Sequence, residues 1–139
     1  MEVIRVDIQL LVSMIVWTLC AAVLLFVLMF VDSLFTRYHD LEEMKKGNLA
    51  VTTRFVLKLL AQAYILSSSI STSSKLSEAL IVSVISFFLL LILEGSVRVL
   101  LSKWGRINLD HGTQQGEIGY GLFAGTLHLA GALIISAFL

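Results

Sequence analysis

Residues 47–70 read GNLAVTTRFVLKLLAQAYILSSSI, and this stretch decides the fold because the chain ends on a second version of it, GEIGYGLFAGTLHLAGALIISAFL, at residues 116–139. A shift of 69 residues aligns the two copies with identical residues at six of 24 positions. The same shift superposes the other two apolar stretches of the chain and lays Arg37 on Arg106. This pattern predicts an internal repeat of two halves.

The composition places the chain in a lipid bilayer. Of 139 residues, 58% are apolar and only 14% are charged, which is far from the average of soluble domains. Ten basic and ten acidic side chains cancel, so no basic field is available for nucleic acid. No glycine-rich phosphate loop follows a strand, which removes the usual nucleotide-binding pattern.

Four stretches are long enough, at 1.5 Å per residue, to cross a hydrocarbon core of roughly 30 Å. We predict spans at residues 8–31, 49–70, 76–101 and 117–139. Polar loops at residues 32–48 and 102–116 separate the first span from the second and the third from the fourth. The sequence KKGN at residues 45–48 indicates that a short interfacial helix ends just before the second span.

Each half, residues 1–70 and 76–139, then holds two spans, so both halves enter the membrane in the same sense. The sequence predicts an all-α fold. We expect an integral membrane four-helix bundle made of two parallel two-helix repeats, related by an axis along the membrane normal.

Basic residues in short loops give the orientation. One side of the membrane holds five of them: Arg37, Lys45, Lys46, Lys103 and Arg106. The other side holds only Arg5 and Lys75. The positive-inside rule therefore places residues 32–48 and 102–116 in the cytoplasm and both termini outside.

Two spans carry polar stripes. Arg54, Lys58 and Gln62 recur every four residues and share a sector of about 80° on the second span. A stripe on the third span falls within about 120° and consists of Ser83, Ser86, Glu94 and Arg98. The helical rise puts Arg54, Lys58 and Glu94 roughly 8–14 Å below the cytoplasmic interface. We predict an intramembrane charged cluster of Arg54, Lys58, Glu94 and Arg98.

These charges need partners. Two central cations cost the second span about 5–7 kcal/mol, while its ten Leu, Ile, Val and Phe residues return about 3–6 kcal/mol. We favour a structural role, in which Arg54 and Arg98 extend to the cytoplasmic interface and Glu94 pairs with Lys58. Two alternatives stay open: the three cations form a pocket for an anionic lipid head group or solute, or Glu94, Lys58 and His128 form a proton or ion path.

The fourth span carries a GxxxG step from Gly121 to Gly125, with His128 one turn further on. Such a face permits close helix packing, which we expect within the bundle rather than between chains. His128 lacks a second His, Cys or carboxylate at metal-ligand spacing, so we predict no metal and no cofactor. No Ser/His/Asp or Cys/His constellation indicates catalytic residues, and we expect no enzyme activity.

Both halves lead through a glycine and a short run into their second span. These residues are Gly47, Asn48, Leu49 and Ala50 in the first half, and Gly116, Glu117, Ile118 and Gly119, followed by Gly121 and Gly125, in the second. Over nearly the whole chain this combination resembles the YjfL-like family of small uncharacterised bacterial membrane proteins. The sequence departs from that family at Glu117, where asparagine is expected, and at Arg54 and Lys58. The resemblance implies a bacterial inner-membrane location, an association with membrane-stress proteins of the phage-shock type, and no catalytic residues.

Taken together, we predict a multi-pass protein of the bacterial cytoplasmic (inner) membrane that acts as a structural or partner-binding component. Residues 32–48 and 102–116 would be the docking surface for a cytoplasmic or membrane protein partner. The alternative is a small transporter or channel subunit that uses Arg54, Lys58 and Glu94. So small a bundle would need a homo-oligomer to form a pore.

Overall fold

The computed structural model describes residues 7–139, which form six helices and no strand. The helices are α1 (Ile8–Ser33), α2 (Asp40–Lys45), α3 (Leu49–Thr72), α4 (Leu76–Trp104), α5 (Leu109–Gln114) and α6 (Ile118–Ser136). Four of them, α1, α3, α4 and α6, are long and apolar enough to cross a membrane. The predictions of an all-α class and of four candidate spans are therefore confirmed.

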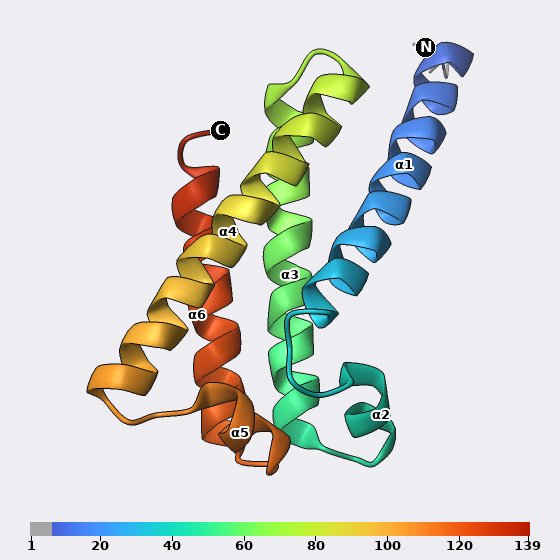
Figure 1. Ribbon diagram of the computed structural model, residues 1–139. Coiled ribbons are helices and arrows are strands. Elements are labelled where there is room, and N and C mark those ends of the chain that lie inside the picture. Colours follow the sequence, from blue (N-terminus) through green and yellow to red (C-terminus); the bar gives the residue numbers. More distant parts are fainter. Residues whose placement is uncertain (1–6) are drawn as a thin grey trace, which may run out of the picture.

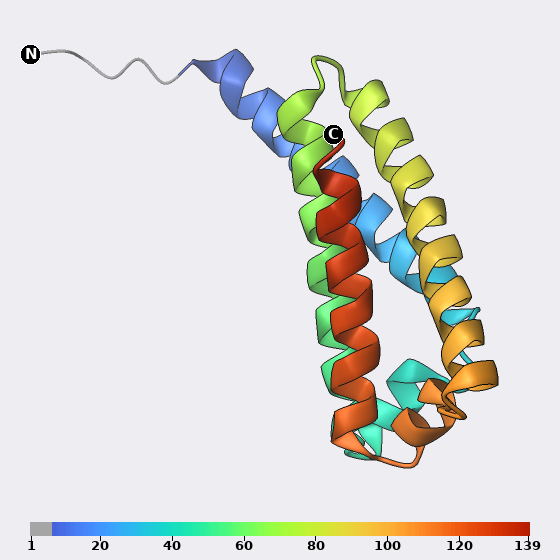
Figure 2. The same ribbon diagram turned by 90° about the vertical axis from the view of Figure 1, so that its left-hand side faces the viewer.

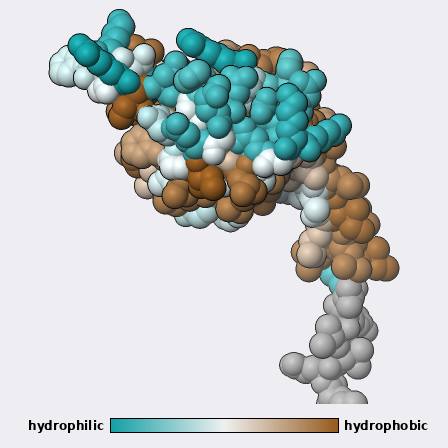
Figure 3. Space-filling view, turned by 90° about the horizontal axis from the view of Figure 1, so that it is seen from below, coloured by the Kyte–Doolittle hydropathy of each residue, from teal (hydrophilic) through white to brown (hydrophobic). Residues whose placement is uncertain are grey.

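The long helices run in two opposite directions. In both ribbon views α3 and α6 lie side by side and run the same way, while α1 and α4 run the other way (Figures 1 and 2). The short helices α2 and α5 gather at the end where α3 and α6 begin, and the C-terminus lies at the opposite end (Figure 1). Seen from below, the end with α2 and α5 is largely hydrophilic (Figure 3).

The closest helix contact in the bundle joins α3 to α6 through small residues. A Cβ atom at Gly121 would collide with the backbone carbonyl of Ala50, and one at Gly125 would lie 2.6 Å from Leu57 Cδ1. The two glycines of the GxxxG step thus face α3 of the same chain. Their missing side chains allow the two backbones to approach, as in other membrane helix pairs.

Helix α1 stands apart from the other long helices. It buries only Leu28, Met29 and Asp32, all near its C-terminal end. Most of its other apolar side chains are exposed, including Phe26 and Phe30. An apolar surface of this extent requires a hydrocarbon surrounding or a partner, so the helix is suited to face lipid along most of its length.

Glycine turns connect each short helix to the long helix after it. Gly47 and Gly116 adopt φ angles of 83° and 85°, in the left-handed region that favours glycine. Directly after Gly47, the Asn48 side chain accepts a hydrogen bond from the Val51 amide at 3.2 Å and donates one to the Gln114 carbonyl at 2.9 Å. Asn48 therefore caps α3 and also ties its first turn to α5.

Several helix ends differ from the expected ones. Helices α1, α3 and α4 end at Ser33, Thr72 and Trp104, two or three residues later than predicted, and α6 covers Ile118–Ser136 instead of residues 117–139. In α3 the extension includes Ser71 and Thr72, whose hydroxyls donate to carbonyls one turn back instead of competing for the backbone of another segment. The short helix α2 was expected, whereas α5 lies in a segment predicted as a loop.

Candidate functional site

Arg54 is the centre of a buried network of charged side chains. It lies near the start of α3 and is 1% exposed. Its Nη1 donates to Asp110 Oδ1 at 2.7 Å and to the Tyr38 hydroxyl at 2.8 Å, and its Nη2 donates to Glu94 Oε1 at 3.3 Å. The planar guanidinium thus joins α3 to α4, to α5 and to the loop before α2.

Lys58 extends the network to α1. One helical turn after Arg54, its Nζ lies 2.8 Å from Asp32 Oδ2 and 3.8 Å from Glu94 Oε1. Asp32, at the end of α1, is 2% exposed. Since α1 buries little else, this ion pair is a principal contact between α1 and the rest of the bundle.

Glu94 also reaches α6. Its Oε2 lies 2.7 Å from His128 Nδ1, and His128 Nε2 lies 3.4 Å from Gln62 Nε2. A neutral imidazole with its proton on Nδ1 fits both contacts, because it donates to the Glu94 carboxylate and accepts from the Gln62 amide. Gln62 Oε1 is buried and has no hydrogen-bond partner within residues 7–139.

The charges of this network balance. Arg98 on α4 completes it, with Nη1 at 3.2 Å from Asp110 Oδ2. The cations are Arg54, Lys58 and Arg98, and the carboxylates are Asp32, Glu94 and Asp110. The three cations and the three carboxylates are equal in number, so each buried charge has an opposite charge beside it, and removal of one partner would leave an uncompensated charge.

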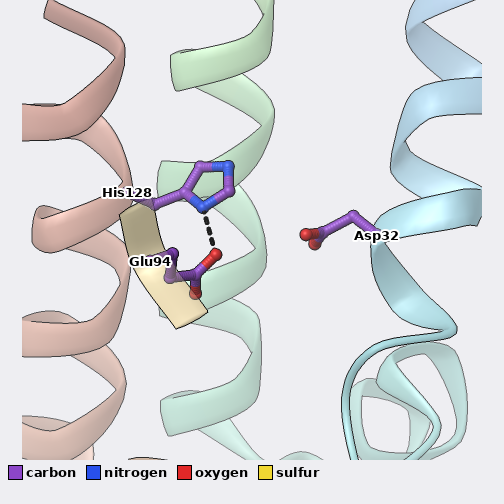
Figure 4. A group of neighbouring side chains, drawn as sticks. All are labelled: Asp32, Glu94 and His128. Carbon is purple, nitrogen blue, oxygen red and sulfur yellow. Dashed lines mark hydrogen bonds and ion pairs between the residues drawn. The ribbon is translucent and has the colours of Figure 1, made fainter. Parts of the chain in front are cut away.

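One part of the network has the shape of a metal site. Ligand atoms of Asp32, Glu94 and His128 all lie within 4.8 Å of one another, and all three residues are buried. Figure 4 shows Glu94 and His128 joined, with Asp32 pointing toward them from α1. However, the Lys58 ammonium lies within 4 Å of both carboxylates and already supplies the compensating charge. A divalent cation would have to displace it.

Comparison with family models gives a match. A family model, Domain of Unknown Function (DUF350), matches residues 6–139. The chain belongs to the DUF350 family. Neither the comparison with curated proteins nor the comparison with solved structures gives a match.

In this DUF350 protein the structure brings together the residues that the polar stripes singled out. Arg54 and Lys58 both pair with Glu94, Arg98 joins Arg54 through Asp110, and His128 contacts Glu94. Gly121 and Gly125 lie on the same helix as His128, against α3.

One expected detail is wrong. Arg54 does not extend to the interface, because Asp110 and Glu94 hold its guanidinium inside the bundle. The predicted pair of Glu94 and Lys58 is present at 3.8 Å, and Lys58 has a second, closer partner in Asp32 at the end of α1.

Sequence reasoning missed three members of the network, namely Asp32, Asp110 and Tyr38. Asp32 directly follows an uncharged span, and Asp110 follows a capping Asn108. Those positions read as loop residues in contact with water. The only available signal was the excess positive charge of α3. This helix carries two cations, and only one carboxylate, Glu94, was predicted to compensate them.

Outside the spans, burial perturbs two ionisable groups. Burial raises the pKa of Tyr38 to about 12, although the neighbouring Arg54 guanidinium opposes this shift. The Arg54 guanidinium carbon also lies 5.9 Å from the centre of the Tyr38 ring. Burial likewise raises the pKa of Asp40, against the opposing effect of Lys58. The end of the network near α2 is therefore shielded from water.

Titration of the tyrosines tests this shielding. The pKa of Tyr38 rises from 10.0 to about 12 on folding, so the folded state keeps this proton longer than the unfolded state. The free energy of unfolding should then fall by up to about 1.4 kcal/mol per pH unit between pH 10 and 12. The ultraviolet absorbance of tyrosinate should show one late transition that Tyr38→Phe removes. A late transition that persists in Tyr38→Phe would contradict the assignment.

Proposed function

We propose that this protein is a non-enzymatic, multi-pass component of the bacterial cytoplasmic membrane that presents a rigid docking surface to a protein partner. The observation that carries the proposal is the buried ion network. Through it Asp110 of α5 and Tyr38 before α2 are bonded to Arg54, inside the bundle. A surface built from short loop helices is useful for binding only if it is held in place.

The position of the basic residues supports a cytoplasmic location for that surface. Arg37, Lys45, Lys46, Lys103 and Arg106 belong to the segments at the α2 and α5 end, and Lys75 belongs to the opposite end. Arg5, the other basic residue assigned to the opposite side, lies outside the described residues. The positive-inside rule then favours a cytoplasmic docking surface and termini on the outer side.

The element bounds support two parallel repeats. Helices α2 and α5 have the same length and the same offset of 69 residues, and α3 and α6 begin with that offset as well. Equivalent glycines lie in the two turns, Gly47 between α2 and α3 and Gly116 between α5 and α6, with nearly the same φ angle. We infer that the two halves arose by duplication. The likeness to YjfL-like proteins, with its link to envelope stress, is part of the same proposal.

A second candidate function is proton or ion translocation through a homo-oligomer. It is favoured by the continuous chain from Glu94 through His128 to Gln62, whose Oε1 atom has no partner in residues 7–139. A chain of hydrogen-bonded ionisable groups inside a span is the arrangement found in proton relays.

Binding and flux measurements separate the two candidates. Copurification with a membrane or cytoplasmic partner should be lost in Lys45→Glu with Lys46→Glu and retained in Lys75→Glu, a charge reversal at the opposite end of the molecule. Vesicles that contain the purified protein should show the same proton and ion flux as empty vesicles. Two results together would favour translocation and reject docking. The vesicles would show a flux that Glu94→Gln abolishes, and the variant Lys45→Glu with Lys46→Glu would still copurify with the partner.

A further inference from the structure

A hollow of about 420 Å³ lies between the end of α1, the last turns of α4 and the start of α5. Its polar lining includes three cations and one carboxylate: Arg37, Arg98, Lys103 and Asp110. Apolar side chains of Phe35, Val99 and Ile107 complete its wall. The hollow therefore combines a net positive charge with an apolar rim.

The cations of this hollow differ from the buried pair on α3. Arg54 and Lys58 are neutralised inside the bundle, whereas Arg37 and Lys103 are exposed and lie within 4.0 Å of no carboxylate in residues 7–139. Arg98 is held in place by Asp110, and its Nε is a buried donor without an acceptor in the same residues. Asp110 in turn is shared with Arg54, so the charge of the hollow stays positive.

The hollow lies at the level expected for the membrane surface. Trp104, at the end of α4 and next to Lys103, is 86% exposed. Exposed tryptophans of membrane proteins concentrate at the level of the lipid head groups. The apolar surface of α4 continues from the hollow toward the membrane interior through Ile92, which is 67% exposed.

We infer that this hollow binds the phosphate group of an anionic phospholipid, with the acyl chains lying along α1 and α4. Two guanidinium groups and one ammonium group belong to residues that line the hollow, and basic pockets between spans on the cytoplasmic side suit such lipids. The site lies within the loop segments proposed as the docking surface, but Lys45 and Lys46 do not line it. It replaces the anion pocket of Arg54, Lys58 and Arg98 considered from the sequence.

Gly95 offers a test that leaves every charge in place. It lines the hollow, and a Cβ atom added there would meet nothing within 4 Å. Leucine at this position would fill the space while its helix propensity exceeds that of glycine. Gly95→Leu should therefore block the hollow in a folded protein.

The experiment uses purified full-length protein in neutral-detergent micelles with either phosphatidylglycerol or phosphatidylcholine, and native mass spectrometry measures the retained lipid. Two net positive charges in the hollow predict a preference of roughly thirtyfold for phosphatidylglycerol. Arg37→Ala with Lys103→Ala should reduce this preference to about threefold or less, and Gly95→Leu should reduce it without any change of charge. The matched control, Lys45→Ala with Lys46→Ala, removes two charges on and just after α2, outside the hollow, and should keep the preference.

Two results would overturn the inference. An equal loss in the control pair would show that the preference comes from the overall charge of that end of the molecule. Calorimetric binding of inorganic phosphate to lipid-free micelles, without any preference for phosphatidylglycerol, would assign the hollow to a soluble phosphate instead of a lipid.

Discussion

Replacing Glu94 with glutamine is expected to lower the free energy of unfolding by about 3–5 kcal/mol. The carboxylate of Glu94 lies against Arg54, Lys58 and His128 at once, and it is 4% exposed. Its loss leaves the network with one uncompensated buried cation. Glutamine keeps the size of the side chain, so the effect reports the charge rather than a cavity.

A matched control lies on the same helix. Glu78, in the first turn of α4, is exposed and pairs with no cation in residues 7–139. Glu78→Gln should lower the free energy of unfolding by less than about 1 kcal/mol, the size of an interaction with the helix dipole. Unfolding in mixed micelles with increasing sodium dodecyl sulfate, followed by fluorescence of Trp17 and Trp104, compares both variants with the parent. Equal stability of the two variants would show that Glu94 is not a structural counter-ion.

The second large effect is expected at the contact between α3 and α6. Gly121→Ala places a methyl group against the carbonyl oxygen of Ala50, which belongs to a helix backbone and cannot rotate away. The two helices must separate, and we expect the free energy of unfolding to fall by about 3 kcal/mol. The same titration in mixed micelles measures it.

Gly119 is the control for this contact. It lies two residues earlier on α6, and a Cβ atom there would meet nothing within 4 Å. Gly119→Ala should leave stability unchanged or raise it by up to about 1 kcal/mol, because alanine restricts the unfolded chain. If Gly121→Ala proved as stable as Gly119→Ala, the close approach of α3 and α6 through Gly121 would be wrong.

Much of the fold could be predicted because it follows from local patterns. Long apolar stretches give the four candidate spans, and the glycines before residues 48 and 117 mark the turns into α3 and α6. Helix α5 escaped prediction because its six residues, LDHGTQ, are mostly polar and contain Gly112. That glycine is required by packing, since a Cβ atom there would overlap the ring of Tyr120 on α6. No pattern within the loop reveals such a contact.

Only part of the candidate site could be predicted from the sequence, namely its residues on α3 and α4. Periodicity on α3 and α4 groups Arg54, Lys58 and Glu94, because residues four apart share a helix face. The partners Asp32 and Asp110 come from segments 26 and 56 residues away along the chain, and they meet the cations only through the folding of α1 and α5 onto the bundle. Charge balance indicates that such partners exist, but tertiary contacts decide which carboxylates they are.

The most direct test of the buried network is a double-mutant cycle between Asp32 and Lys58, whose charged atoms lie 2.8 Å apart. Asp32→Asn and Lys58→Met should each lower the free energy of unfolding by about 3 kcal/mol. The double variant removes both charges and should recover at least about 1 kcal/mol of the summed loss. Losses that add to within about 0.5 kcal/mol would contradict a network in which these two groups depend on each other.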